Sequence, residues 1–385
     1  MEHLLNDQVK SLQISGIRKF FNMVSDKQDI VSLTIGQPDF PTPDHVKNAG
    51  IQAIDQNQTT YTHNAGLLPL RQAITDFAKD NYQLSYNPSN EVIVTVGASQ
   101  AIDITLRTII ETGDEVILPS PVYPGYEPLI RLAGGTPVHV DTRPNFFKLT
   151  KDLIETHITN KTKCIILPYP SNPTGMSLNR QELQEIADLL ADKDIFILAD
   201  EIYSELVYEH EHISLGTFSQ VREKTIIING VSKSHSMTGW RIGYLLCPAW
   251  LCQHILKVHQ YNVSCATSIS QHAAIAALKN GRQDPIEMRH QYRKRRDYVY
   301  ERLVNMGLNV IKPDGAFYFF IGIELDGISS YELASRLVEE AGLALVPGDA
   351  FSEGGQGFLR LSYAYDLHTL EEGLNRLEKF LERNM

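Results

Sequence analysis

Lys233 is the side chain of this sequence best suited to covalent chemistry. It follows Ser232 in Val231–Gly243, a run rich in small and hydroxyl-bearing residues that also contains a second cation, Arg241. Small neighbours leave the amine sterically open, and desolvation near another cation lowers the pKa of a lysine, so that more of the amine is neutral and nucleophilic. The competing interpretation is an ordinary loop with two solvated charges.

A carboxylate and a phenol stand together at the end of another apolar segment. Asp200 directly follows Ile195–Ala199, and Tyr203 comes about one helical turn later. A carboxylate at the end of a buried strand is costly unless a cation or several donors pair with it. Asp200 is therefore a candidate partner for a cationic ligand atom, although aspartate also begins many helices as an N-cap.

Two further loops carry small or rigidly held polar residues. Gly97–Ala101 (Gly-Ala-Ser-Gln-Ala) opens a helix, whose free N–H groups and dipole favour an anion, and Ser99 adds a hydroxyl. Ser171–Gly175 (Ser-Asn-Pro-Thr-Gly) holds Asn172 between two prolines, an arrangement suited to a fixed hydrogen bond with a ligand. A tight strand-to-helix turn and a plain Asn-Pro turn are the alternatives.

The segments that must position these residues alternate between strand-like and helix-like patterns. Such alternation predicts an α/β fold with a mostly parallel sheet, in which ligands bind at the carboxyl ends of the strands. Each of the four stretches follows such a strand. The expected strands are Val92–Val96, Val116–Leu118, Cys164–Leu167, Ile195–Ala199 and Thr225–Ile228, and the expected helices are Ala101–Ile110, Tyr126–Leu132 and Arg180–Ala191.

The C-terminal part has a different texture. A long charged helix is expected at Glu287–Met306, followed by strands at Ala316–Ile321 and Phe358–Ser362 and by helices at Tyr331–Ala341 and Leu367–Arg383. This order predicts a smaller α+β domain. We place an N-terminal arm and small-domain segment at 1–43, a large domain at 44–285 and a small C-terminal domain at 286–385.

Composition excludes several classes of function. The chain has 385 residues, with 35 Lys and Arg against 46 Asp and Glu and a net charge of −11, which disfavours binding to nucleic acid. It shows neither a secretory signal nor a run of about 18 apolar residues, so we expect a cytoplasmic protein without membrane association. Its four cysteines form no C-x-x-C pair and are expected to be reduced.

The common catalytic motifs are also missing. The sequence contains no Walker loop, no G-x-G-x-x-G after a strand, no G-x-S-x-G and no H-E-x-x-H. His210 and His212 lie close together but lack a recognisable third ligand, so no metal site is expected. His235, within the lysine stretch, is expected to support the site or lie at the surface rather than to act as a catalyst.

In order and spacing, the four stretches resemble the class I/II aminotransferases, pyridoxal 5'-phosphate enzymes of fold type I. Ile35–Phe40 is similar to the family's N-terminal substrate loop, Tyr61–Arg71 to its partner-subunit phosphate motif, and Phe358–Ser362 to the strand that carries its carboxylate-binding arginine. The resemblance spans nearly the whole chain. It implies a mostly parallel seven-stranded sheet in the large domain, a smaller α+β domain, pyridoxal 5'-phosphate as cofactor, and a homodimer with shared active sites.

The resemblance also implies roles for the residues around the cofactor ring. Lys233 would form a Schiff base with the cofactor and then move a proton from the substrate Cα to C4′ of the cofactor, while Asp200 would pair with the pyridine nitrogen. Asn172 and Tyr203 would hydrogen-bond the phenolic oxygen of the ring, and Tyr123 would stack on its face.

A second set of implied roles concerns the anionic groups of cofactor and substrate. The phosphate would be held by the loop and cations at Ala98, Ser99, Gln100, Ser232 and Arg241, and by Tyr61 of the other subunit. Arg360 would clamp the substrate α-carboxylate with both prongs of its guanidinium, together with Asn172, and Gly36 would leave room for that carboxylate.

Within the family, four stretches resemble the acetyl-diaminopimelate aminotransferases of Gram-positive bacteria: Val31–Phe40, Leu167–Gly175, Ile228–Gly243 and His254–Gln271. This predicts transfer between N-acetyl-LL-diaminopimelate and 2-oxoglutarate by a ping-pong mechanism in lysine biosynthesis. An aspartate or aromatic amino-acid aminotransferase is one alternative, and the arginine that a dedicated aspartate enzyme needs has only Arg18 and Arg131 as candidates. A cystathionine-type β-lyase would share the cofactor residues. The intact Lys233, Asp200 and Arg360 argue against a binding protein without turnover.

Overall fold

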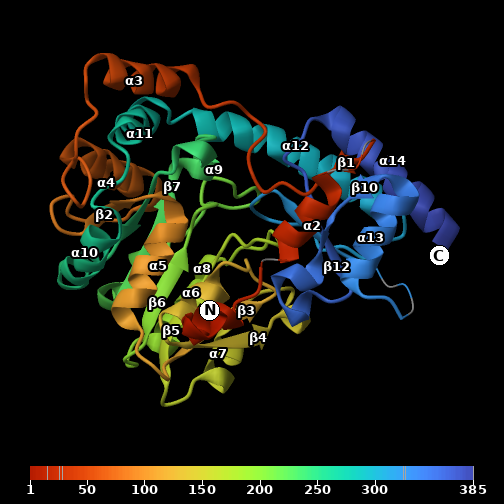
Figure 1. The fold of residues 1–385 in the computed structure, drawn as a ribbon, viewed down its shortest axis with the longest axis horizontal. Helices are drawn as coiled ribbons and strands as arrows, with labels where there is room; N and C mark the ends of the chain where they lie inside the picture. The colour runs from red at the N-terminus through yellow and green to blue at the C-terminus, as the bar shows by residue number, and fades with distance from the viewer. Residues whose placement is uncertain (15, 26, 28, 324, 326, 385) are drawn as a thin grey trace.

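A seven-stranded sheet forms the centre of the larger part of the molecule in this computed structural model, which describes all residues except 15, 26, 28, 324, 326 and 385 (Figure 1). β8 runs antiparallel to both of its neighbours, β2 and β7, and the other pairs are parallel, which confirms the predicted mostly parallel sheet. In spatial order the strands are β2 (Val92–Thr95), β8 (Gly243–Leu246), β7 (Thr225–Gly230), β6 (Phe196–Asp200), β5 (Thr162–Leu167), β3 (Glu115–Ser120) and β4 (Thr136–Asp141).

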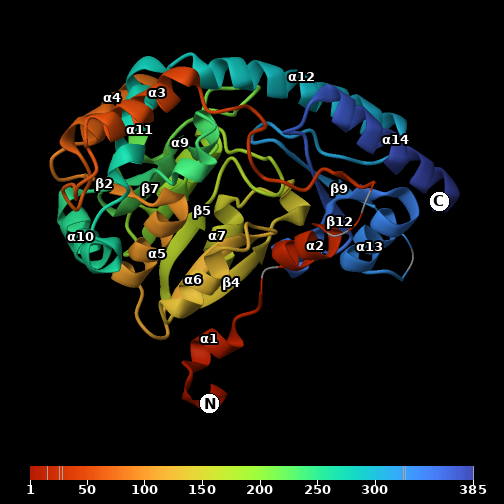
Figure 2. The ribbon, with the colours of Figure 1, turned by 45° about the horizontal axis from the view of Figure 1, so that its top comes forward.

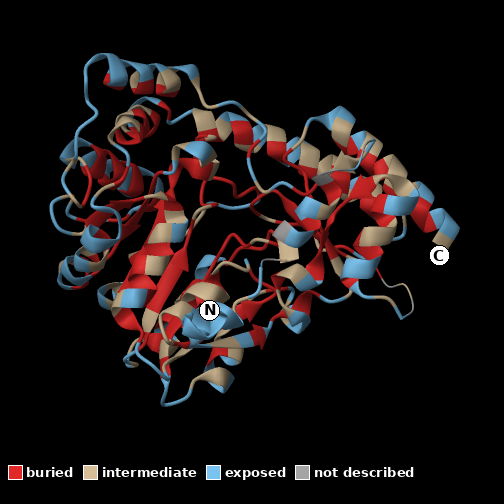
Figure 3. Ribbon diagram, viewed as in Figure 1, coloured by how far each residue is buried: buried red, intermediate tan, exposed pale blue. Residues whose placement is uncertain are grey.

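Helices cover both faces of this sheet, so its strands other than the edge strand β4 are largely buried on both sides (Figure 3). Successive strand residues alternate between the faces: Leu198 packs in one apolar cluster and Ile197 in another. One face carries α5 (Gly97–Ile109), α6 (Tyr126–Leu132) and α10 (Ala249–Val263). The opposite face carries α4 (Leu68–Tyr82), α7 (Lys151–His157), α8 (Arg180–Leu190) and α11 (Ser268–Asn280), and α3 (Asp44–Asp55) packs on α11.

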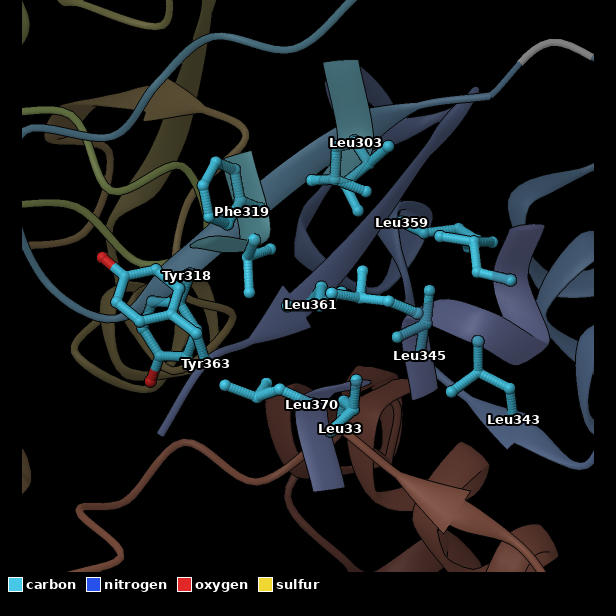
Figure 4. Close-up of a cluster of buried hydrophobic side chains, with 14 of the residues drawn as sticks. Leu33, Leu303, Tyr318, Phe319, Leu343, Leu345, Leu359, Leu361, Tyr363 and Leu370 are labelled. Atoms are coloured by element: carbon cyan, nitrogen blue, oxygen red, sulfur yellow. The ribbon is translucent and has the colours of Figure 1, made fainter. Parts of the chain in front are cut away.

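The smaller part of the molecule is built from both ends of the chain. β9 (Tyr318–Gly322), β12 (Phe358–Ser362) and β11 (Val346–Pro347) form an antiparallel sheet, while β1 (Val31–Ser32) pairs in parallel with β10 (Leu343–Ala344). Together with α13 (Ser330–Ala341) and α14 (Leu367–Asn384) they enclose a core of leucine and aromatic side chains (Figure 4). The domain limits 1–43, 44–285 and 286–385 stay predictions.

One long helix connects the two parts. α12 (Asp284–Asn305) runs from beside α11 to the small sheet and α14 (Figure 2). It begins earlier than the expected Glu287, because Pro285 occupies its first turn, where a missing N–H costs nothing. Its buried stripe of Met288, Tyr292, Val299 and Leu303 has the spacing of a single helix face.

The N-terminal helices contact both parts of the molecule, α1 (Asp7–Ser11) through α6 and α2 (Gly16–Ser25) through β11. α1 stands away from the sheet in Figure 2. Sequence patterns did not single out α3, α4, α10, α11, β4 or β8, because these elements are short or lack a clean apolar period. No helix of the described residues has both the length and the apolar character needed to cross a membrane.

Candidate active site

A cavity of about 250 Å³ opens at the carboxyl ends of the parallel strands, where α/β sheets bind ligands. It brings together most of the residues that the sequence singled out, although they come from separate loops. The lining includes Gly36, Ala98, Ser99, Tyr123, Asn172, Asp200, Tyr203, Ser232, Lys233 and Arg241. The four motif stretches thus meet at one place, as the strand order requires.

Lys233 belongs to α9 (Val231–Ser234), a single turn that directly follows β7. Its amine donates a hydrogen bond to the carbonyl oxygen of Gly36 at 2.6 Å. Removal from water, and then the nearby positive charges of Arg360 and Arg241, lower the pKa of Lys233 to about 8. The neutral fraction at physiological pH is then far greater than that of an ordinary lysine, which suits this amine to act as a nucleophile and a proton carrier.

Asp200 is the last residue of β6, and its carboxylate is buried. Tyr126 donates its hydroxyl proton to Oδ2 at 2.6 Å, and the N–H of Ile202 donates to Oδ1 at 3.2 Å. These neutral donors do not offset the cost of burial, which raises the pKa of Asp200 to about 6. Tyr126 is a site residue that the sequence analysis did not predict. The signal that could have identified it is its position just after Tyr123, at the start of an expected helix.

An anion cradle lies at the start of α5. The helix begins at Gly97 after β2, so the N–H groups of Ala98 and Ser99 have no partner one turn earlier in the helix. Gly97 has a φ of +75°, and a Cβ there would lie 2.3 Å from Nη2 of Arg241. Only glycine therefore allows the guanidinium to approach the helix N-terminus this closely.

Arg360 lies in an adjoining cavity of about 640 Å³ that shares Gly36, Tyr123 and Asn172 with the first. It is 2% exposed, and its Nη1 donates to Oδ1 of Asn172 at 2.9 Å while Nη2 donates to the carbonyl of Thr34 at 2.6 Å. Its Nε is buried and has no hydrogen-bond partner among the described residues. The guanidinium is therefore fixed in direction yet retains capacity for a further acceptor.

Two predicted cofactor residues lie outside the cavity lining. Gln100 accepts from the N–H of Val96 at 2.7 Å and donates to Asn262 at 2.8 Å, so its side chain joins backbone and helix α10. Tyr61 is 89% exposed on a surface loop. Within the single chain, neither side chain reaches the cavity, and both roles stay predictions.

The remaining candidates have structural partners. His235 is buried and pairs with Ser234 and the carbonyl of Gly281, and burial lowers its pKa to about 4. His210 contacts Ser177, and His212 contacts Glu201. Among the described residues, no group of three or more His, Cys, Asp or Glu side chains could hold a metal ion.

The arginines weighed for an aspartate enzyme do not identify one. Arg131 pairs with Glu127 on the same helix, α6. The side chain of Arg18 lies outside the described residues.

The donor set fits pyridoxal phosphate. The buried Asp200 lacks a cationic partner at hydrogen-bond distance in the described part of the chain, and a protonated ring nitrogen would supply one. The N-terminus of α5 with Arg241 suits a phosphate, and Lys233 provides the amine. Tyr123 stands edge-on to Tyr126, with ring centroids 5.6 Å apart, and borders the cavity with its own ring.

Comparison with known proteins agrees with this donor set. The family model for aminotransferase class I and II matches residues 28–377. The chain belongs to this family. A probable N-acetyl-LL-diaminopimelate aminotransferase of Bacillus subtilis is 57% identical over 381 residues, covering 99% of this chain and 96% of that protein. Aromatic-amino-acid aminotransferase 2 of Thermococcus litoralis is 40% identical and covers 98% of both chains.

Structural comparison leads to the same family. A mutant aspartate aminotransferase of Thermus thermophilus superposes with a TM-score of 0.93 at 36% identity, covering 97% of this chain and 99% of that one. The protein is thus an aminotransferase of fold type I that acts on amino and oxo acids, and its family uses pyridoxal phosphate. The similar proteins carry different substrate names, so family membership leaves the side chain of the substrate open.

Proposed function

We propose that this aminotransferase carries pyridoxal 5'-phosphate on Lys233 and transfers an amino group between N-acetyl-LL-diaminopimelate and 2-oxoglutarate by a ping-pong mechanism. The observation that carries the chemistry is the amine of Lys233 in the cavity, with a pKa of about 8. The observation that favours this substrate is the 57% identity with the Bacillus subtilis protein along nearly the whole chain.

Each residue then has a physical task. Bound pyridoxal phosphate supplies the electron sink for the negative charge that develops at the substrate Cα. Nζ of Lys233 would take the proton from the substrate Cα as a base and deliver a proton to C4′ of the cofactor as an acid, which is the shift that transamination requires. Asp200 would hold the positive charge of the ring nitrogen, and Asn172 and Tyr203 would hydrogen-bond the ring oxygen. Arg360 would bind the α-carboxylate and so hold the substrate Cα in the part of the site that contains the lysine.

The adjoining cavity favours an apolar substrate segment along its wall. Its lining is largely apolar, with Ile17, Phe20 and Phe21 from α2 facing Pro128 and Leu129 of α6. Among the described side chains that line it, Arg360 is the one cation. The methylene chain of N-acetyl-LL-diaminopimelate suits these walls. Its distal carboxylate, like the side-chain carboxylate of 2-oxoglutarate, would need water or a polar partner, because burying an unpaired charge is costly.

We further propose that two copies of the chain share their active sites. The loop of Tyr61 is anchored, since Thr62 accepts from Gln271 at 3.0 Å and Asn64 donates to Ser264 at 2.7 Å, yet the Tyr61 ring is 89% exposed. Tyr261 on α10 is 88% exposed. Large aromatic side chains held outward in this way are typical of interfaces.

A donor panel tests the substrate. The holoenzyme would be assayed with 2-oxoglutarate and, in turn, N-acetyl-LL-diaminopimelate, aspartate, phenylalanine and cystathionine. We expect the highest kcat/KM with the first, and a higher value with aspartate or phenylalanine would contradict the substrate. Release of pyruvate and ammonia from cystathionine would instead indicate a β-lyase.

Borohydride reduction followed by peptide mass spectrometry tests the lysine. The cofactor adduct is expected on the peptide that contains Lys233 and should be lost in Lys233→Ala. An adduct that persists in this variant would contradict the assignment of Lys233.

A further inference from the structure

Tyr318 joins two parts of the site that are far apart in the chain. It begins β9 and is 0% exposed. Its phenolic oxygen lies 2.8 Å from that of Tyr203, and the guanidinium carbon of Arg360 lies 4.4 Å from its ring centroid. Figure 4 shows Tyr318 at the edge of the leucine core, with its hydroxyl directed away from the leucines. The small domain thus holds this side chain against the active site.

The hydroxyl of Tyr318 determines which acceptor the hydroxyl of Tyr203 can donate its hydrogen bond to. Each phenol has a single proton to donate. Tyr203 lines the cavity, so it can donate to a ligand there only when the bond between the two phenols is donated by Tyr318. In a site shielded from water, the hydrogen bond donated by Tyr318 also polarises the hydroxyl of Tyr203. This strengthens the hydrogen bond that Tyr203 donates to the ligand.

The ring of Tyr318 supports the guanidinium of Arg360. In the described part of the chain, Arg360 is buried with the neutral acceptors Asn172 and Thr34 and no carboxylate. The negative face of an aromatic ring attracts such a cation most strongly where water is excluded. β-sheet register fixes this contact, because Tyr318 and Arg360 lie on the paired strands β9 and β12.

The hydroxyl of Tyr318 packs closely against the backbone at Gly36. A Cβ at Gly36 would lie 2.5 Å from the phenolic oxygen of Tyr318. The space that glycine leaves here is therefore needed for Tyr318, in addition to any room it gives the substrate carboxylate.

We propose that Tyr318 is a positioning residue for transamination, whose hydroxyl directs the proton of Tyr203 toward the cofactor and whose ring holds Arg360 toward the substrate carboxylate. The inference rests on the proposed function, which gives Tyr203 and Arg360 their ligands.

Tyr318→Phe tests the hydroxyl alone. The readout is the pH midpoint at which the visible absorbance band of the bound cofactor changes. A weaker donor at the ring oxygen disfavours the deprotonated, more negative form, so we expect the midpoint to rise by about 0.5 pH unit. The dissociation constant of 2-methylglutamate, an amino acid without a Cα proton, should stay within about twofold because the ring remains. An unchanged midpoint would overturn the hydroxyl role.

Tyr318→Met tests the ring while filling much of its volume. We expect the same rise in midpoint and, in addition, a roughly tenfold weaker binding of 2-methylglutamate, the loss typical of a desolvated cation–π contact. Unchanged binding would overturn the ring's role. Should Tyr318→Met fail to fold, Tyr318→Leu measures the same loss, and Tyr318→Phe still decides the hydroxyl.

Phe319→Met is the matched control. Phe319 follows Tyr318 on β9 and is equally buried, within the core of Figure 4. It should lower thermal stability without moving the midpoint or the dissociation constant, and equal shifts in this variant would reduce Tyr318 to a core residue. A wild-type protein without a cofactor adduct on Lys233 would refute the proposed function. An adduct on Lys233 together with a pH midpoint that is unchanged by Tyr318→Phe would refute only this inference.

Discussion

Nη1 of Arg360 donates a hydrogen bond to Oδ1 of Asn172 at 2.9 Å. The contact joins β12 in the smaller part of the molecule to the Ser171–Gly175 loop in the larger part, 188 residues away in the chain. Because the amide side chain is neutral, it orients the guanidinium without neutralising it. The positive charge therefore stays available for a substrate carboxylate, and the two parts of the molecule meet at the residue proposed to bind it.

Arg360→Lys should weaken every amino-acid and oxo-acid substrate. Lysine keeps the charge but loses the planar fork, and each hydrogen bond to a charged group contributes about 1.5–3 kcal/mol, so kcat/KM should fall about 10- to 100-fold for all substrates. Steady-state kinetics with glutamate and a second donor would measure this. Arg131→Lys, in the exposed pair with Glu127, is the control and should change little. A loss confined to one substrate would contradict a clamp on their common group.

Asp200→Asn should stabilise the cofactor-free protein at neutral pH. Burial raises the pKa of Asp200 from 3.8 to about 6, so the folded state binds a proton more tightly than the unfolded state does. The free energy of unfolding then falls as pH rises from about 4 to about 6 and stays lowered above that, by roughly 3 kcal/mol at most. Asparagine removes this penalty.

Urea unfolding of the cofactor-free proteins at pH 7 and pH 5 would measure the effect. The gain of Asp200→Asn should be larger at pH 7 than at pH 5. The exposed Asp76→Asn should show no such difference. Equal stabilities of wild type and Asp200→Asn at pH 7 would show that the folded protein accommodates the carboxylate without cost. In the holoenzyme the same substitution should weaken activity, since the ring nitrogen loses its counter-charge.

Tyr123→Ala should loosen the cofactor, whereas Tyr123→Phe should retain it. The ring borders the cavity and rests edge-on against Tyr126. Aromatic pairs contribute about 0.5–1.5 kcal/mol beyond their buried area, so the cofactor dissociation constant should rise roughly 3- to 10-fold or more on truncation. Equilibrium dialysis of the cofactor would measure this, and equal affinities of the two variants would contradict a stacking role.

The sequence predicted the local parts of the site better than the contacts between them. Lys233, Asp200 and Asn172 each follow a strand, and a parallel sheet necessarily brings such positions to one edge. Tyr126 was placed correctly on a helix, but its bond to Asp200 depends on how α6 crosses the sheet. Tyr318 was only part of an expected strand, because nothing local predicts a contact with Tyr203 across 115 residues.

Element limits show the same division between local and tertiary effects. α5 begins at Gly97 rather than at the expected Ala101, because packing against Arg241 and the sheet outweighs the poor helix propensity of glycine. α6 was predicted with its observed limits, Tyr126–Leu132, since its apolar period and flanking turns agree with the tertiary structure.

Mixed dimers should reveal whether active sites are shared. Tyr61→Ala would remove the phenol proposed to reach the partner's phosphate, and Lys233→Ala would remove the amine of its own site. In a dimer of one copy of each variant, one site regains both native residues and the other has neither. When the two inactive variants are unfolded together and refolded at equal amounts, we expect roughly a quarter of the wild-type activity, since half of the dimers are mixed and half of their sites are native. Activity no higher than the average of the two separate variants would show that Tyr61 acts within its own subunit or not at all.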